Sequence, residues 1–185
     1  MKTAIFVNGV PASGKSTVAA QVAKLTGWPL LALDTVKEAL FAQLGTGDRD
    51  YNRKLGRASY QAIFAQIADF PPHSGVVIDA WFGFQPRKVL DAYIARAKLE
   101  MIGEIWCHAP PEIIGARYAA RVQARSGGHL GLDYVPELLT LASTARPLGD
   151  FPKFEIDTSR PFLLHELAAW VGQLKSHAGS SHARR

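Results

Sequence analysis

A short segment near the N-terminus, GVPASGKST, combines glycines, a lysine and hydroxyl side chains in a pattern that could bind phosphate. It follows an apolar run of strand character, TAIFVN, and precedes VAAQVAKL, which is typical of a helix. The spacing matches G-x-x-x-x-G-K-[ST], in which glycines let backbone N–H groups converge on an anion and the helix N-terminus adds its positive dipole end. In such a loop Lys15 would reach the β- and γ-phosphates, and the Ser16 hydroxyl would be a ligand for Mg²⁺. A chance match or an ordinary glycine turn is the alternative, but the strand, loop and helix context favours a nucleoside triphosphate bound by Gly9, Pro11, Ala12, Ser13, Gly14, Lys15, Ser16 and Thr17.

Two aspartates at the ends of predicted strands could supply the carboxylates of a phosphoryl-transfer site. Asp34 ends PLLALD and precedes the helical TVKEAL, so it could be a simple N-cap. The position also lies beside the expected phosphate loop, where a carboxylate can orient an acceptor hydroxyl and take its proton. Asp79 ends GVVID, and an aspartate in that place is the usual second partner of Mg²⁺, often through water. We therefore expect Asp34 to be catalytic, and we expect Ser16 and Asp79 to bind Mg²⁺.

Aromatic and basic residues near these carboxylates could line a pocket for the acceptor. Trp81, Phe82 and Phe84 follow the third predicted strand, and they favour either core packing or one apolar wall of a small-ligand site. Arg53 and Arg57 lie on the long predicted helix before that strand. They are either solvated or part of the same pocket.

Three arginines spaced four residues apart, Arg117, Arg121 and Arg125, share one face of a predicted helix. A solvated charged face is one interpretation, but phosphoryl transfer needs positive charge around the transferring group. We expect Arg121 to contact phosphate and to be catalytic, and Arg117 to lie at the phosphate or on the adenine side. The run ends in SGGHLG, so we expect a lid near residues 122–133. Within it His129 is expected to be a surface histidine.

The elements that must position these residues alternate between strand-like and helix-like runs. Short, nearly continuous apolar runs such as GVVID are typical of parallel strands covered on both faces. The expected strands are Thr3–Asn8, Pro29–Leu33, Gly75–Asp79, Glu104–His108 and Phe154–Asp157. The expected helices are Lys15–Leu25, Thr35–Leu44, Arg49–Asp69, Pro86–Met101, Pro111–Arg125, Val135–Ser143 and Pro161–Lys175. This order predicts an α/β fold with a parallel sheet and ligands at the carboxyl ends of its strands.

Length and composition predict one globular domain. The 185 residues are 48% hydrophobic and 20% charged, and no run is long enough to span a bilayer. We read no signal peptide, and the single Cys107 lies in an apolar run, so we expect it to be buried in a cytoplasmic protein. The net charge of +5 suits nucleotides or phosphorylated substrates as well as nucleic acid. We expect a single domain over residues 1–176 and a disordered tail over residues 177–185.

These motifs together resemble P-loop phosphotransferases of the nucleotide-kinase-like group. The layout is similar to chloramphenicol phosphotransferase-like kinases, zeta-toxin-like kinases and the kinase module of polynucleotide kinases. The resemblance rests on GVPASGKST, LALDTVKEAL, GVVIDAWF, WCHAPPEIIGARYAAR and FEIDTS. It implies a three-layer α/β/α P-loop fold with a five-stranded parallel sheet in the order 2-3-1-4-5, and it implies ATP and Mg²⁺. It also implies that Asp34 activates the acceptor, that Arg117 and Arg121 are the paired helix arginines, and that Thr158 lies near the adenine.

Three functions remain open from the sequence. The favoured one is an ATP-dependent kinase that phosphorylates a hydroxyl of a small molecule such as an antibiotic, sugar or nucleoside-like metabolite. The second is a 5′-hydroxyl polynucleotide kinase, although Lys37 stands where polynucleotide kinases often have an arginine. The third is a regulatory nucleotide-binding module with little catalysis, which would not require Asp34. A monomer and a homodimer are both compatible with the sequence.

Overall fold

The fold is built on one parallel sheet of five strands. The computed structural model describes residues 1–124 and 128–180, and for residues 177–180 it describes the backbone alone. All four strand pairs are parallel, in the order β2-β3-β1-β4-β5, which confirms the predicted sheet. The strands are β1 (Lys2–Asn8), β2 (Leu30–Ala32), β3 (Gly75–Ala80), β4 (Leu99–His108) and β5 (Lys153–Asp157).

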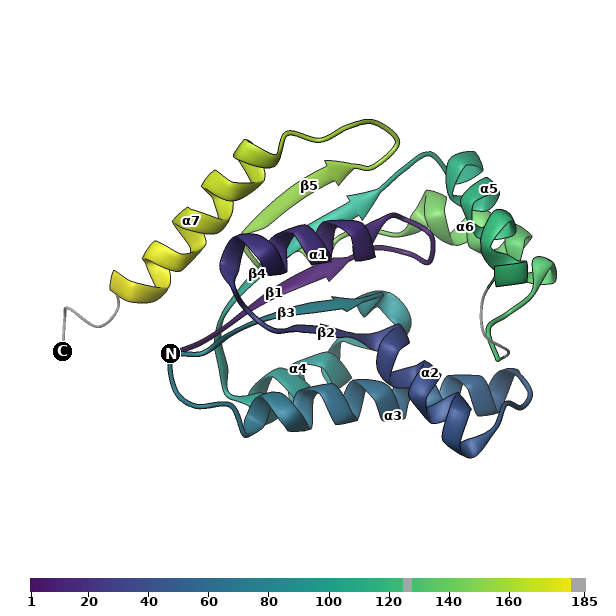
Figure 1. The fold of residues 1–185 in the computed structure, drawn as a ribbon, viewed down its shortest axis with the longest axis horizontal. Helices are drawn as coiled ribbons and strands as arrows, with labels where there is room; N and C mark the ends of the chain where they lie inside the picture. Colours follow the sequence, from purple (N-terminus) through teal and green to yellow (C-terminus); the bar gives the residue numbers. More distant parts are fainter. Residues whose placement is uncertain (125–127, 181–185) are drawn as a thin grey trace.

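Helices cover both faces of the sheet and extend past its carboxyl edge. Figure 1 shows α1 and α7 on one face, α3 and α4 on the other, and α2, α5 and α6 beyond the strand tips. Among the described helices, none is long and apolar enough to cross a membrane. The helices are α1 (Lys15–Thr26), α2 (Leu33–Leu44), α3 (Arg49–Ala68), α4 (Arg87–Ala97), α5 (Pro111–Arg121), α6 (Val135–Thr144) and α7 (Leu164–Ser180), with 3-10 turns η1 (Phe82–Phe84), η2 (Val122–Ala124) and η3 (Leu132–Tyr134).

The central strand β1 divides the core into two layers. All seven of its residues are buried, because helices cover both faces of the sheet. Ala4 and Phe6 pack into the cluster beneath α3 and α4, whereas Ile5 and Val7 pack into the cluster beneath α1 and α7. Covering on both faces explains why the strand is apolar at successive positions rather than at alternate ones. The phosphate loop therefore leaves the sheet from a strand that is buried along its whole length.

The boundary between α4 and β4 differs from the prediction. The helix ends at Ala97 instead of Met101, and β4 begins at Leu99 instead of Glu104. Lys98 ends the helix in the left-handed conformation, with φ +54°. Left-handed helix caps are usually glycine, so a lysine gives no sequence signal for the stop. The early part of β4 then pairs with β1, where Met101 lies opposite Thr3.

Two other helix boundaries also bear on the predicted site and tail. Helix α2 begins at Leu33, so Asp34 lies in its first turn and not at the N-cap, which is Ala32. The interpretation of Asp34 as an N-cap is therefore wrong, because the strand ends at Ala32, one residue before the end of its apolar run. Helix α7 continues to Ser180 and overlaps the expected tail, while residues 181–185 lie outside the described residues.

Candidate active site

The phosphate-loop segment connects β1 to α1 in a tightly curled conformation. Gly9 has φ +158°, and a Cβ there would lie 2.4 Å from the carbonyl oxygen of Cys107. Gly14 has φ +82°, and a Cβ there would lie 3.1 Å from the side chain of Thr158. Ala12 is also left-handed, with φ +66°, a conformation that costs a non-glycine residue free energy. The two glycines are thus required by the loop itself, as a phosphate-binding turn demands.

Asp79 has the surroundings expected of a metal ligand. Its side chain is buried at the end of β3, and its Oδ1 has no hydrogen-bond partner among the described residues. Burial raises the pKa of Asp79, while the positive charge of Lys15 and a hydrogen bond from Ser16 oppose this shift. A buried oxygen without a donor is costly, and a cation would satisfy it. Because hydroxyl and carboxylate oxygens are ligands that Mg²⁺ accepts, Ser16 and Asp79 fit a magnesium site.

One cavity collects most of the predicted catalytic residues. It has a volume of about 640 Å³, in the range of small-molecule sites, and Lys15, Ser16, Asp34, Asp79 and Arg121 all line it. The two carboxylates lie close enough for the charge of Asp34 to add to the raised pKa of Asp79, after the larger effect of burial. The same cavity is lined by Pro11, Ala12, Arg53 and Arg57, whereas Gly9, Ser13, Gly14, Thr17, Arg117 and Thr158 lie outside its lining.

The aromatic residues after β3 divide between the cavity and the core. Trp81 and Phe84 line the cavity. Phe82 is instead buried and stacks on Phe6 with ring centroids 4.3 Å apart. Its backbone N–H donates to Oδ1 of Asn8 at 3.1 Å, which turns the side chain inward. Phe82 is therefore a core residue, and the pocket-wall interpretation applies to its two neighbours.

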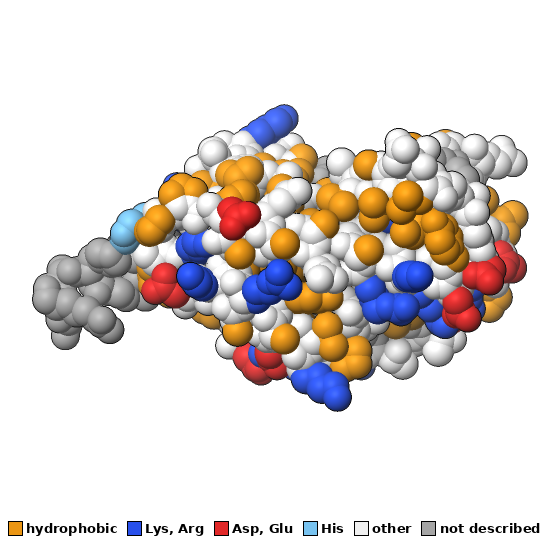
Figure 2. Space-filling view, turned by 90° about the horizontal axis from the view of Figure 1, so that it is seen from below, with side chains coloured by type: hydrophobic (Ala, Val, Ile, Leu, Met, Phe, Trp, Pro, Cys, Tyr) orange, Lys and Arg blue, Asp and Glu red, His pale blue; other side chains and the backbone are white. Residues whose placement is uncertain are grey.

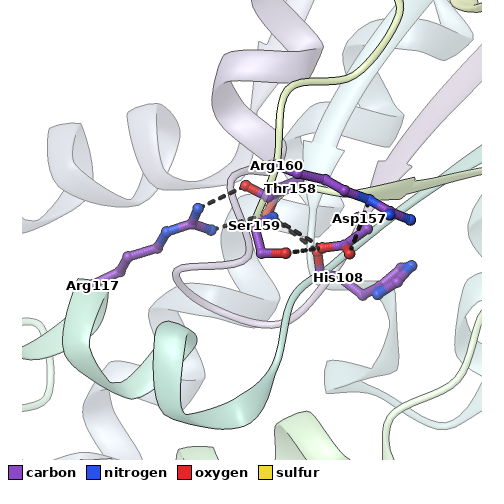
Figure 3. Close-up of polar contacts among 6 residues, drawn as sticks. All are labelled: His108, Arg117, Asp157, Thr158, Ser159 and Arg160. Carbon is purple, nitrogen blue, oxygen red and sulfur yellow. Dashed lines mark hydrogen bonds and ion pairs between the residues drawn. The ribbon is translucent and has the colours of Figure 1, made fainter.

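The arginines of α5 separate into two environments. Figure 3 shows Arg117 reaching from α5 to the segment after β5, where its guanidinium donates to the Thr158 hydroxyl at 3.0 Å and to the Thr158 carbonyl at 2.7 Å. The Thr158 hydroxyl in turn lies 2.8 Å from the carbonyl oxygen of Ser13 in the phosphate loop. Arg117 thus braces the loop through Thr158, while Arg121, one turn further along, lines the cavity. Arg125 lies outside the described residues.

The described part of the lid lies against α2 and α3. The His129 ring nitrogen Nε2 is 2.9 Å from a carboxylate oxygen of Glu38, and its ring meets Phe41 edge to face. The Asn52 side-chain amide donates to the carbonyl oxygen of Gly128. Only 8% of the His129 side chain is exposed, so the expectation of a surface histidine is wrong. Contacts with α2 bury the ring, which local sequence could not reveal.

A buried polar network lies beside the phosphate loop, and it was not predicted from the sequence. Glu104 on β4 is fully buried and accepts hydrogen bonds from the Asn8 side-chain amide at 2.7 Å and from the backbone N–H of Leu148. Asn8 also accepts from the backbone N–H of Phe82. The network joins the start of the phosphate loop to the segment that follows Asp79. A glutamate within the apolar run GEIWCH is the signal that could have indicated it.

The sequence belongs to a known domain family. The profile of a family described as an AAA domain matches residues 5–130, which is more than half of the 185-residue chain. The chain therefore belongs to this family. A comparison with curated proteins finds no match.

Solved structures with this fold include several kinases. A protein described as a "putative kinase" from Chloroflexus aurantiacus superposes with a TM-score of 0.78, at 24% identity, over 93% of this chain and 97% of that chain. A gluconokinase from Sinorhizobium meliloti has a TM-score of 0.60 at 20% identity, covering 98% and 97% of the two chains. The tunicamycin resistance protein of Deinococcus radiodurans has a TM-score of 0.55 at 15% identity, covering 97% and 96%. These similarities confirm the predicted P-loop kinase fold.

Proposed function

We propose that the protein is an ATP-dependent kinase that transfers the γ-phosphoryl group to a hydroxyl of a small molecule in the cytoplasm. The observation that supports this proposal is one shared cavity, which is lined by Asp34, Asp79 and the phosphate-loop residues Lys15 and Ser16. A regulatory nucleotide-binding module would not need a carboxylate at Asp34. Structural neighbours described as a gluconokinase, a sugar kinase and a shikimate kinase support a small acceptor.

Each cavity residue has a distinct part in the proposed transfer. Asp34 would accept the proton of the acceptor hydroxyl, whose oxygen forms a bond to the γ-phosphorus. The bond from that phosphorus to the bridging oxygen breaks, and ADP leaves. Lys15 and Arg121 would hold the phosphate oxygens and stabilise the negative charge on the transferring group. Arg117 would keep the loop in place through Thr158, with the adenine expected nearby.

Ser16 and Asp79 would hold Mg²⁺. When bound, the metal supplies positive charge that neutralises the phosphate oxygens. The orphaned Oδ1 of Asp79 is the structural reason to place the metal there. Lys15, whose charge acts on Asp79 in the structure, lies on the same side of the cavity.

The test is release of ADP from ATP and Mg²⁺ in the presence of pooled acceptors, namely sugars, antibiotics, nucleosides and 5′-hydroxyl oligonucleotides. We expect acceptor-dependent ADP release by the wild-type chain, with phosphate recovered on a small molecule. Lys15→Ala should fold normally, because Lys15 is only partly buried at the first position of α1, and should lose about 10²-fold or more of kcat. Transfer to oligonucleotides alone would favour a polynucleotide kinase instead. A Lys15→Ala variant with kcat within about threefold of wild type would contradict the proposal.

A further inference from the structure

One face of α3 forms part of the cavity wall. Asn52, Arg53, Gly56 and Arg57 all contribute to the lining. Their spacing places them on one stripe of the helix, because residues four apart in a helix are neighbours on its surface. The stripe therefore presents two guanidinium groups, one turn apart, to the same end of the cavity.

The cavity carries more positive than negative side chains. Its lining includes six basic residues and three acidic ones. The basic residues are Lys15, Lys37, Arg49, Arg53, Arg57 and Arg121, and the acidic residues are Asp34, Asp79 and Glu137. Part of this charge is neutralised at the rim, where Arg49 and Glu137 form an ion pair of 2.5 Å. Figure 2 shows one group of Lys and Arg side chains toward the end of the molecule that holds α2, with Asp and Glu side chains beside it and further Lys and Arg side chains elsewhere on the same face.

The two arginines of the stripe are weakly compensated. Arg53 lies 3.6 Å from Asp50, and both side chains are largely exposed, so solvent screens the pair. The Arg57 guanidinium has no ion-pair or hydrogen-bond partner within residues 1–124 and 128–180. Arginine guanidinium groups bind carboxylates and phosphates through paired hydrogen bonds. This end of the cavity is thus suited to an anion.

An aromatic wall stands beside the arginine stripe. Trp81 and Phe84 line the cavity, and the centroid of the Trp81 ring also lies 6.1 Å from that of Trp106. The Tyr60 hydroxyl donates to the backbone carbonyl of Trp81, and the Tyr60 ring stacks on Phe84 with centroids 6.2 Å apart. Tyr60 itself is buried. The wall therefore packs on other aromatic side chains, and it suits an apolar or planar surface.

We infer that the acceptor is an anionic molecule, one whose carboxylate or phosphate binds Arg53 and Arg57 while an apolar or planar body rests on Trp81 and Phe84. This inference rests on the proposed kinase function, because it assigns the acceptor side of the same cavity. The anion is directed toward α3 because the carboxylate of Asp34 and the triphosphate repel it from the opposite end. The hydroxyl of the acceptor then faces Asp34.

The inference is tested by calorimetry on the whole chain without ATP, using matched probes. One pair is 4-(hydroxymethyl)benzoate and its methyl ester, which isolates a carboxylate. The other is uridine 5′-monophosphate and uridine, which isolates a phosphate. We expect the anionic member of at least one pair to bind about tenfold more tightly than its neutral partner. Which pair shows the preference distinguishes carboxylate from phosphate acceptors.

Substitutions test which cavity residues cause the tighter binding of the anionic probes. Arg57→Gln and Arg53→Gln should each reduce it severalfold, whereas Lys54→Gln should not, because Lys54 is exposed on the same helix outside the cavity lining. Lys15→Ala should retain it, because the anion site is separate from the phosphate loop. Equal binding of neutral and anionic probes overturns the inference. So does a preference that survives both arginine substitutions, or one that disappears in Lys15→Ala alone.

Calorimetry with ATP and Mg²⁺ on the same samples separates the two proposals. If ATP binds and ADP is released with neutral acceptors only, the kinase stands and the anionic acceptor is wrong. If ATP does not bind, the kinase proposal fails, and with it the assignment of this anion site to an acceptor.

Discussion

The two cavity carboxylates differ in the surroundings that the chain gives them. Asp79 is buried at the end of a central strand, with a raised pKa and one oxygen that has no hydrogen-bond partner within residues 1–124 and 128–180. Asp34 lies in the first turn of α2, exposed to the cavity. A buried carboxylate next to Lys15 and Ser16 suits a fixed cation, whereas an exposed one can meet a hydroxyl that enters from solvent. Their roles in the proposed reaction should therefore be separable by substitution.

The first prediction compares Asp34→Asn with Asp79→Asn. Asp34→Asn keeps the side-chain size but removes the proton acceptor, and positioned general bases contribute about 10²–10⁴-fold. We expect kcat to fall in that range while the Kd for an ATP analogue stays within a few-fold of wild type. Asp79→Asn should instead weaken the dependence on Mg²⁺ and lower all ATP turnover, including slow hydrolysis. The measurements are calorimetric Kd values beside kcat with the identified acceptor. Loss of ATP binding in Asp34→Asn with normal kcat would mean that the two roles are reversed.

At the scale of elements, the loop and the strand tips are held together by buried polar contacts. Asn8, at the end of β1, is nearly inaccessible and bonds to both Glu104 and the backbone of Phe82. The contacts tie the start of the phosphate loop to β4 and to the turn after β3. Because an unmatched polar group in the interior is costly, the network specifies how these three elements meet.

The second prediction concerns this network. Asn8→Ala leaves the buried Phe82 N–H without its acceptor, at a cost of about 1–3 kcal/mol, and it removes one hydrogen bond to Glu104, which keeps the Leu148 N–H. We expect the free energy of unfolding to fall by roughly 2–5 kcal/mol, measured by urea denaturation. Ser143→Ala is the control, because Ser143 is exposed and its hydroxyl donates to the Thr140 carbonyl within its own helix, α6. A loss below about 0.5 kcal/mol in Asn8→Ala would show that water replaces the network.

The sequence predicted those elements whose signals are local. Continuous apolar runs identified all five strands, and the G-x-x-x-x-G-K-S spacing identified the loop before its geometry was known. The helix stop at Lys98 was missed because it depends on a left-handed lysine. The role of Glu104 was missed because its partners Asn8 and Leu148 lie 96 and 44 residues away. The convergence of Asp34, Arg57 and Trp81 on one cavity likewise depends on packing between elements rather than on spacing.

At the scale of the whole molecule, the lid and the helices beyond the sheet enclose the cavity from two sides. Arg49 of α3 pairs with Glu137 of α6 at 2.5 Å, and the Tyr118 hydroxyl of α5 donates to the Leu130 carbonyl at 2.7 Å. The Arg49–Glu137 pair links α3, which lines the proposed acceptor site, to α6. The Arg49–Glu137 pair is exposed, and such pairs are weak enough to break and reform during a catalytic cycle, whereas the Tyr118 side chain is buried.

The central sheet, by contrast, should open only when the molecule unfolds, and Cys107 can report on it. This single cysteine is fully buried on β4, and burial raises the pKa of its thiol, with the charge of Lys15 opposing the shift. A buried, protonated thiol does not react with disulfide reagents, so labelling requires exposure of the strand. We therefore expect native labelling to be slower than labelling in denaturant by a factor that follows the equilibrium constant for unfolding.

The last prediction uses this thiol to test nucleotide binding by the whole chain. A ligand that binds only the native state, at about 100 times its Kd, adds about 2.7 kcal/mol to the free energy of unfolding. ATP with Mg²⁺ at that concentration should slow Cys107 labelling about 100-fold, because the labelling-competent fraction falls in proportion. Lys15→Ala is the matched control, since it should label at the rate of the free protein and gain little protection from ATP. If the native thiol reacts as fast as the denatured one, the strand is accessible without unfolding. If labelling is slow but unchanged by millimolar ATP, the phosphate loop does not bind this nucleotide and the kinase proposal fails.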